Sequence, residues 1–512
     1  MNIETTHLIN HLHDLLESSA KVTADSRQVR SGDIFFAYPV GHGKALRDGR
    51  EYISAALQNG AAAIVFDPAG MGDDYMDHPQ FFAVENLAKQ AGQLCSQWYD
   101  FPSKQLKVIG VTGTNGKTTI TQWLAQALDQ SNSRAAVVGT LGSGFPNALI
   151  QTGYTTPDAP RLQSQIKALL DAGAKQIALE VSSHALEQDR IAGLELNCAV
   201  FTNLSQDHLD YHGSMANYAE AKAKLFKQTG LEHAVVNIDD TFGRELVIQL
   251  LAQHHIKVWA YALSKEPFAG FEKFGDRLNR IYAKDTVLRT AGYDSVFVHE
   301  DAGEHIVHAP VLGEFNLSNC LAVWSVLLTQ GMTCELASKR LSLLRPVNGR
   351  MELVSLNKTP KAEGPIVVVD YAHTPDALKK ALLALRPIAS ARGGNIWCVF
   401  GCGGDRDIGK RPQMGKIAQQ YADQIILTSD NSRSEEVDTI ISMILTGMNV
   451  GAKNIQTVPD RAAAIMAAVR HAEVADVILV AGKGHESTQE IKGKKFDFSD
   501  QEHILLSAGG MA

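Results

Sequence analysis

Short apolar runs recur along the chain, and each one ends in a polar or glycine-rich loop. In the middle of the sequence these runs are 108–112, 176–181 and 199–203, and nearer the C-terminus they are 366–369, 396–400, 424–428 and 477–480. Segments with helical spacing separate them, and in 120–128 the apolar residues recur three or four positions apart. This alternation predicts an α/β fold with mostly parallel, doubly wound sheets, whose ligands bind at the carboxyl ends of the strands.

Two breaks in this pattern divide the chain. Residues 99–104 and 344–349 both contain proline among polar residues, as expected of a linker. We therefore expect three domains, at 1–103, 104–345 and 346–512, which is consistent with a length of 512 residues. The first is a smaller α/β unit, with apolar runs at 34–37 and 62–66 on either side of a helix-like stretch at 52–58.

Composition and charge exclude several classes of protein. Hydrophobic residues make up 45% of the chain and charged residues 20%, which is typical of a folded globular protein. The formal net charge of −8 argues against a nucleic-acid or anionic membrane partner. The sequence has no secretory signal and no apolar run as long as a membrane span, and its six cysteines form no CxxC pair. We expect a cytoplasmic protein with free thiols and no membrane span.

A glycine-rich loop follows the strand at 108–112 and opens the next helix. It reads Gly113, Thr114, Asn115, Gly116, Lys117, Thr118 and Thr119. At such a junction backbone N–H groups bind phosphates, while the lysine contacts the β- and γ-phosphates and the threonine holds Mg²⁺. The generic motif needs a glycine where Val111 stands, so a turn without a chemical role is the alternative. The combination of strand, lysine, threonine and helix favours a phosphate site.

Two more polar segments follow strands of the same region. Glu180 ends the strand at 176–181, where a carboxylate can hold Mg²⁺ directly or through water, although a solvated strand end is equally ordinary. His208 and His212 follow the next strand. A third ligand with zinc spacing is lacking, so one histidine on Mg²⁺ and simple packing both remain open.

Lys222 has an unusual position in its predicted helix. It shares one face with four apolar or aromatic residues, Tyr218, Ala221, Leu225 and Phe226, whereas Lys224 lies on the other face. Because an unpaired ammonium is costly among apolar groups, Lys222 should be paired, chemically altered, or extended to reach solvent. The helix pattern by itself favours the extended form.

Two loops of the C-terminal region follow strands of one predicted sheet. The first is 430–433, with Asp430, Asn431, Ser432 and Arg433, and the second is 482–486, from Gly482 to Glu486. At one sheet edge they would offer an arginine to a carboxylate and a glutamate to an amine, which is what an amino acid requires. A surface arginine and a tight turn are the simpler alternatives.

Taken together, these segments resemble the Mur ligase family over essentially the whole chain. The matching motifs are 25–27, 113–119, 180–184, 203–210 with 221–222, 313–316, 349–352, 370–373, 403–406 and the two C-terminal loops. The resemblance implies a UDP-sugar-binding domain at 1–103, a P-loop ATPase-like domain at 104–345 and a Rossmann-like amino-acid-binding domain at 346–512. It also implies a monomeric ATP-dependent ligase of peptidoglycan precursor synthesis, which joins an amino acid to a UDP-N-acetylmuramoyl dipeptide through an acyl phosphate.

The family pattern also implies roles for individual residues. Catalysis would involve Lys117, Lys222, Glu180 and His208, and Mg²⁺ would be held by Thr118, Glu180, His208 and Lys222 as a carbamate. ATP would be bound by 113–119 with Asn316, Arg350, Asp370 and His373. The UDP-muramoyl peptide would contact Ser26, His42, Gly43, Lys44, Thr155, Thr156, Ser182, Gln188 and Arg190. The amino acid would contact Arg406, Asp430, Asn431, Ser432, Arg433, Gly482 and Glu486.

The amino-acid loop carries one departure from the family pattern. Members that add diaminopimelate have Asp-Asn-Pro-Arg there, whereas this chain has Ser432 in place of the proline. Ser432 and Glu435 fit a capping box that would restore order to the loop. Because Arg433 suits a distal carboxylate, the resemblance favours meso-diaminopimelate over L-lysine as substrate.

Two rival classes remain as alternatives. A folylpolyglutamate synthetase has a similar phosphate loop, but it would need neither the N-terminal uridine-binding segment nor the loop at 430–433. A P-loop regulatory switch should carry a guanine-reading Asn-Lys-x-Asp segment, which this sequence lacks.

Overall fold

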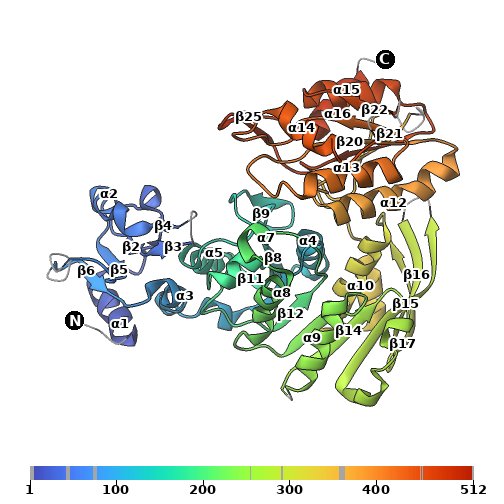
Figure 1. The fold of residues 1–512 in the computed structure, drawn as a ribbon. Helices are drawn as coiled ribbons and strands as arrows, with labels where there is room; N and C mark the ends of the chain where they lie inside the picture. Colours follow the sequence, from blue (N-terminus) through green and yellow to red (C-terminus); the bar gives the residue numbers. More distant parts are fainter. Residues whose placement is uncertain are drawn as a thin grey trace.

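Three main sheets follow one another along the chain and form three bodies, which Figure 1 shows from blue through green and yellow to red. The structure is a computed structural model, and it describes residues 5–41, 46–72, 78–253, 255–289, 292–356, 364–449, 451 and 454–509. The positions of the domain boundaries, at 103 and 345, stay predictions.

The N-terminal body is a small parallel sheet covered by helices. Its strands follow the order β1 (Val22–Thr23), β2 (Ile34–Ala37), β5 (Ala63–Phe66) and β6 (Phe81–Ala83). Helices α1 (Thr5–Leu15) and α3 (Leu87–Trp98) share one core with this sheet, and α2 (Ile53–Gln58) lies in a second core. A short hairpin joins β3 (Pro39–Val40) to β4 (Arg47–Asp48). The two strands and the helix expected in 34–66 are thus present, as β2, β5 and α2.

The central body holds an eleven-stranded sheet. Its parallel part runs in the order β8 (Arg134–Gly139), β11 (Ala174–Glu180), β7 (Lys107–Thr112), β12 (Cys198–Phe201), β13 (His233–Asn237), β14 (Lys257–Ala262) and β15 (Leu278–Arg289). Antiparallel strands extend both edges, with β9 (Gly142–Phe145) and β10 (Ala148–Ile150) on one side and β16 (Gly292–His299) and β17 (Gly303–Ala309) on the other. Of the parallel strands, β7, β11 and β12 were predicted, whereas β8, β13, β14, β15 and the antiparallel extensions were not.

Helices cover both faces of the central sheet. One core contains residues of α5 (Ala159–Asp171), α6 (Ser183–Glu187) and α9 (Thr241–Leu251), and the other contains α4 (Lys117–Leu128), α10 (Glu314–Thr329) and α11 (Cys334–Leu341). Two short helices, α7 (Leu209–His212) and α8 (Met215–Ala223), follow β12. Within the described ranges, no helix is both long and apolar enough to cross a membrane.

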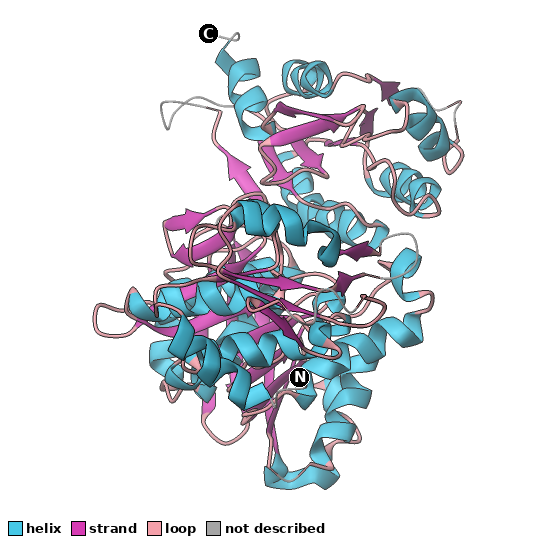
Figure 2. Cartoon of the chain, turned by 90° about the vertical axis from the view of Figure 1, so that its left-hand side faces the viewer, coloured by secondary structure: helices cyan, strands magenta, loops and turns pink. Residues whose placement is uncertain are grey.

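The C-terminal body is a doubly wound sheet, with helices on both sides in Figure 2. Its order is β18 (Glu352–Val354), β19 (Ile366–Asp370), β23 (Val477–Ala481), β20 (Ile396–Phe400), β21 (Gln424–Leu427) and β22 (Ile455–Thr457), in which only β18 is antiparallel. One face packs on α12 (Pro375–Arg392), α13 (Lys410–Tyr421) and α14 (Val437–Leu445), and the other on α15 (Arg461–His471) and α16 (Asp500–Gly509). A hairpin of β24 (Thr488–Ile491) and β25 (Lys494–Asp497) follows β23.

Candidate active site

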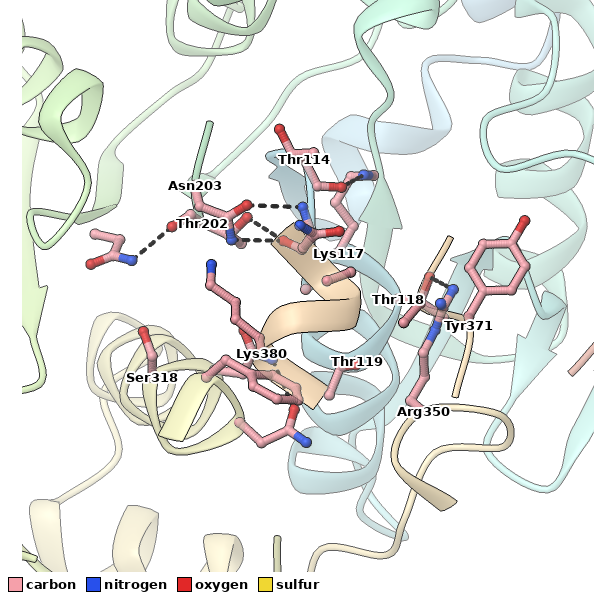
Figure 3. Close-up of a pocket in the computed structure, with 18 of the residues that line it drawn as sticks. Thr114, Lys117, Thr118, Thr119, Thr202, Asn203, Ser318, Arg350, Tyr371 and Lys380 are labelled. Carbon is pink, nitrogen blue, oxygen red and sulfur yellow. Dashed lines mark hydrogen bonds between the residues drawn. The ribbon is translucent and has the colours of Figure 1, made fainter. Parts of the chain in front are cut away.

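A cavity of about 730 Å³ lies at the carboxyl ends of the central parallel strands. The loop after β7, the end of β11 and the helices α8 and α10 line it from the central body. Arg350 and the segment from Asp370 to His373 line it from the C-terminal body. The site is therefore shared between two parts of the chain, and Figure 3 shows the side chains that meet there.

The glycine-rich loop after β7 has the backbone that a phosphate site needs. Gly113 and Gly116 have φ angles of +151° and +90°, and a Cβ at Gly116 would lie 2.7 Å from Asn319 Oδ1. Helix α4 begins at Lys117, so its free N–H groups face the loop. The Nζ of Lys117 donates to the carbonyls of Gly113 and Thr114 at 2.9 and 2.8 Å.

Neighbouring strands hold this loop in place. The Oγ1 of Thr202 donates to the carbonyl of Asn115 at 2.6 Å, and the N–H of Asn115 donates to Asn203 Oδ1 at 3.0 Å. Both partners follow β12, the strand beside β7. The loop is thus shaped before any ligand binds, which lowers the ordering entropy that binding must overcome.

Glu180 is fully buried at the end of β11, which rules out the solvated strand end. Its Oε2 accepts hydrogen bonds from the hydroxyls of Thr118 and Thr140, both at 3.0 Å, and its Oε1 accepts from the N–H of Thr140 at 2.9 Å. Arg350 Nη2 donates to Thr118 Oγ1 at 3.1 Å, as Figure 3 shows. Thr140 was missed from the sequence, because the strand before it, β8, was not predicted either. Carboxylate and hydroxyl oxygens of this kind suit Mg²⁺.

Lys222 is buried, with 1% of its surface exposed. Its Nζ donates to the carbonyl of Gly113 at 2.8 Å and lies 4.2 Å from the centre of the Tyr218 ring. Burial, together with the charge of Lys117, holds the pKa of Lys222 well below its usual range. Lys224 points the other way and pairs with Glu187 at 2.8 Å, with 40% of its side chain exposed. The predicted helix face is confirmed, and the idea that Lys222 extends to solvent is wrong.

His208 lies beside Lys222 at the cavity, in a left-handed conformation with φ of +53°. Burial lowers its pKa to about 4, so the ring is neutral near pH 7 and has a lone pair for a metal. His212 is buried, and its Nε2 lies 2.9 Å from the hydroxyl of Ser183, which assigns it to packing. Across the described part of the chain, no three His, Cys, Asp or Glu side chains are grouped closely enough to hold a metal by themselves.

The residues predicted for the muramoyl peptide divide into two places. Thr156, Ser182, Gln188 and Arg190 form one network, in which Arg190 donates to the Thr156 carbonyl at 2.8 Å and to Gln188 Oε1 at 3.0 Å. The Oγ1 of Thr156 accepts from the N–H of Ser182 at 3.1 Å. Thr155 joins it to Glu180 through Thr140, because the two threonine hydroxyls lie 3.0 Å apart.

The N-terminal members of that set lie elsewhere. Ser26 is buried in the N-terminal body, where its carbonyl accepts from Asn59 Nδ2 at 2.9 Å, and it is not among the residues that line the cavity. His42, Gly43 and Lys44 lie outside the described residues. A uridine site in this body would therefore be separate from the cavity.

The four residues predicted for ATP outside the loop all line the cavity. Asn316 is buried on α10 and accepts from Asn319 Nδ2 at 3.0 Å, while the Arg350 guanidinium lies 4.3 Å from the centre of the Tyr371 ring. Asp370 accepts from the N–H of Met351 at 2.8 Å, and burial raises its pKa. Burial lowers the pKa of His373. Asn319 was not predicted, and nothing in its sequence context marks it.

The two C-terminal loops meet at one sheet edge, as expected, but away from the cavity. Asn431 Nδ2 donates to Glu486 Oε2 at 2.7 Å, and the fully buried Lys483 donates to the same oxygen at 3.0 Å. Gly482, with φ of +114°, lies against Asp430, whose carboxylate a Cβ would overlap. Arg406 is exposed at the edge of this cluster. Lys483 was missed because a lysine between two glycines resembles a surface turn.

The capping box expected in this loop is wrong. Helix α14 begins at Val437 with Glu436 before it, and the carboxylate of Glu435 accepts from both terminal nitrogens of the buried Arg411, at 2.8 and 2.7 Å. Ser432 is buried, and its hydroxyl has no hydrogen-bond partner among the described residues. A buried guanidinium outcompetes a helix N-terminus for the carboxylate, since both members of the ion pair carry full charge.

Comparison with known proteins identifies the family. Residues 111–327 match the model for the Mur ligase middle domain, and 349–484 match the model described as Mur ligase, glutamate ligase domain. The chain is 48% identical over 502 residues to a UDP-N-acetylmuramoyl-L-alanyl-D-glutamate--2,6-diaminopimelate ligase from Ralstonia nicotianae, covering 98% of this chain and 95% of that one.

One solved structure supports this assignment, and a second shares the fold. The solved structure of a UDP-N-acetylmuramoyl-L-alanyl-D-glutamate--2,6-diaminopimelate ligase is 32% identical and has a TM-score of 0.65. The match covers 100% of this chain and 99% of that one. Folylpolyglutamate synthase from Mycobacterium tuberculosis, solved with ADP and AMPPCP, has a TM-score of 0.60 at 16% identity and covers 77% of this chain and 92% of that one. The second likeness shows a shared fold only, whereas the near full-length identities show that the chain belongs to the Mur ligase family.

Proposed function

We propose that this protein adds meso-diaminopimelate to UDP-N-acetylmuramoyl-L-alanyl-D-glutamate, with ATP as co-substrate, in peptidoglycan precursor synthesis. The observation that carries the proposal is the pairing of two sites on one chain. The cavity joins the phosphate loop to Glu180, Lys222 and Arg350, and a separate loop cluster presents Arg433 and Glu486. The relatives that cover nearly the whole chain carry this activity in their names.

The reaction requires two transfers. The γ-phosphoryl group of ATP passes to the terminal carboxylate of the dipeptide and leaves ADP, and the amine of the amino acid then attacks the acyl phosphate. Phosphate leaves, the amine loses a proton and an amide bond forms. Lys117 and Arg350 converge on the loop, where cations stabilise the charge that develops on the moving phosphoryl group.

The residues present fit Mg²⁺. Thr118 and Glu180 bring hard oxygen atoms within 3.0 Å of each other, and the neutral His208 and the buried Lys222 lie at the same cavity. As a carbamate, Lys222 would replace a buried cation by an anion with two oxygens, which removes the unfavourable charge next to Lys117. When bound, Mg²⁺ would neutralise charge on the phosphate oxygens.

The muramoyl peptide would bind from the N-terminal body to the cavity, through Ser26 at one end and Thr155, Ser182 and Arg190 at the other. Arg161 links the two regions, because its guanidinium lies 3.6 Å from the carboxylate of Asp25. ATP and a UDP-linked sugar are cytoplasmic compounds, so the reaction would take place in the cytoplasm. One chain carries every part of this arrangement, which favours a monomer.

The deciding experiment measures phosphate release from ATP. Release that requires both the UDP-muramoyl dipeptide and meso-diaminopimelate supports the proposal, and release that requires a folate supports the rival ligase. A charged hydrogen bond contributes about 1.5–3 kcal/mol, so meso-diaminopimelate should exceed L-lysine in kcat/KM by roughly 10- to 150-fold. Arg433→Ala should narrow that ratio, while Arg470→Ala, at an exposed position on α15, should not. Equal use of lysine by the wild type would overturn the choice of substrate.

A further inference from the structure

The guanidinium expected to bind the distal carboxylate of the substrate already has a carboxylate beside it. Glu490 Oε2 lies 3.8 Å from Arg433 Nε, and the two side chains are 31% and 24% exposed. The one side-chain hydrogen bond of Arg433 among the described residues goes to backbone, since Nη1 donates to the carbonyl of Gly404 at 2.7 Å. Arg433 is therefore neutralised from within the chain.

The backbone of Glu490 is attached directly to the amino-acid loop. Its N–H donates to Asn431 Oδ1 at 2.8 Å, and its carbonyl accepts from the N–H of Arg433 at 3.1 Å. The preceding residue, Gln489, is buried and donates to Ser429 Oγ at 2.9 Å and to the carbonyl of Asp430 at 3.1 Å. The position of Glu490 is thus set by its backbone and by the side chain of Gln489, not by its own carboxylate.

A substrate carboxylate and Glu490 would compete for the same edge of the guanidinium. Arginine binds a carboxylate best through two parallel N–H groups. Because Nη1 is engaged by Gly404, the edge formed by Nε and Nη2 is the better one for such a pair, and Glu490 lies at Nε. At 3.8 Å the contact is an ion pair without a hydrogen bond, so a bidentate ligand can displace it.

We propose that Glu490 is a specificity-determining residue, whose carboxylate opposes the distal carboxylate of the incoming amino acid at Arg433. The inference rests on the proposed function and adds to it a residue that affects the choice between the two amino acids. With lysine bound, Glu490 would stay paired with Arg433, so the guanidinium would not be left without a partner. The residue therefore weakens binding of diaminopimelate and also weakens discrimination against lysine.

The test is Glu490→Gln, which keeps the size of the side chain and the main-chain contacts. An exposed ion pair of this kind corresponds to about a two- to fivefold change, so KM for meso-diaminopimelate should fall by that factor, with kcat unchanged. The ratio of kcat/KM for meso-diaminopimelate to that for L-lysine should rise in parallel. A matched control is Glu436→Gln, which removes a carboxylate that lies before α14 and pairs at 3.0 Å with Lys492 of the same hairpin. This change should leave both quantities unchanged.

Three results would overturn the inference. A higher KM in Glu490→Gln would mean that this carboxylate binds the amine of the substrate, and an unchanged KM would mean that it has no role in selection. An equal effect of Glu436→Gln would mean that only the overall negative charge around the amino-acid loops matters. A wild type that is inactive with meso-diaminopimelate would instead overturn the proposed function, and this inference with it. Denaturant unfolding of the variants shows that each one folds.

Discussion

Replacing Lys222 by methionine should stabilise the protein and abolish its activity. The side chain is 1% exposed, and its Nζ has one hydrogen bond in the described structure, to the carbonyl of Gly113 at 2.8 Å. Methionine fills nearly the same volume without a charge. The Gly113 carbonyl keeps a partner in the variant, because Lys117 also donates to it at 2.9 Å.

The magnitude follows from the groups that change. The variant loses the contact with the Tyr218 ring, which for a desolvated cation contributes about 2 kcal/mol, and one net hydrogen bond of about 1 kcal/mol. It also removes the desolvation of an ammonium, a penalty of several kcal/mol, and the repulsion from Lys117. We expect a gain of about 1–3 kcal/mol in the free energy of unfolding.

The measurement compares Lys222→Met with Lys224→Met, two residues along the same segment. Denaturant unfolding is recorded in carbon-dioxide-free buffer without metal, and phosphate release is recorded with all three substrates. Lys224→Met breaks only the partly exposed pair with Glu187, so it should lose less than about 1 kcal/mol and keep its turnover. If Lys222→Met is less stable than the wild type, the buried ammonium does not destabilise the fold. If the two variants are equally active, Lys222 has no special role in catalysis.

Three shorter predictions concern other side chains. Lys117→Ala should lower ATP-dependent phosphate release at least about a hundredfold, and near wild-type turnover would contradict the phosphate-loop assignment. Ser432→Ala should raise the free energy of unfolding by about 1 kcal/mol, because the buried hydroxyl lacks a partner among the described residues. Ser434→Ala should lower the free energy of unfolding, because it removes a hydrogen bond to Asp405. If denaturant unfolding shows Ser434→Ala to be the more stable variant, this explanation is wrong. Arg411 lowers the pKa of Glu435 to about 2, so this pair stabilises the fold above the ordinary value of 4.5 and is lost as the pH falls. Between pH 5 and 2 the free energy of unfolding of the wild type should fall by about 1–2 kcal/mol more than that of Glu435→Gln. If the free energies of the two proteins fall in parallel, the pair does not stabilise the fold.

Much of the fold could be predicted because the sequences of buried parallel strands are continuous apolar runs. The runs at 108–112, 366–369 and 396–400 all form strands that are buried on both faces. The strands β9 and β16 were not predicted, because their sequences contain no such run. They are edge extensions with glycine and polar residues, and their pairing depends on the neighbouring strand rather than on a local pattern.

The residues of the candidate site also divide into those that could be predicted from sequence and those that could not. Gly113, Lys117 and Glu180 could be placed from sequence, since each lies at the end of a predicted strand and carries its chemistry in its residue type. Thr140 and Glu490 could not, because a threonine after one strand and a glutamate in a hairpin become informative only through their partners. The sequence therefore predicts the residues at strand ends that bring their own chemistry to the site. Residues that act only through a partner side chain can be found only in the three-dimensional structure.

The buried charges of the C-terminal body explain why its two loops hold a fixed relation to each other. The guanidinium of Arg461 and the carboxylate of Asp500 are both fully buried and are joined by hydrogen bonds of 2.7 and 2.8 Å. The remaining donors of Arg461 reach the carbonyls of Ser429 and Ala481, the residues just before the two amino-acid loops. A planar, always-charged group that bonds both strand ends at once sets their spacing, which a flexible lysine in the same place would not. We therefore expect the two loops to act as one rigid unit, and selection among amino acids to depend on Arg433 in the first loop and on Glu490 in the neighbouring strand β24.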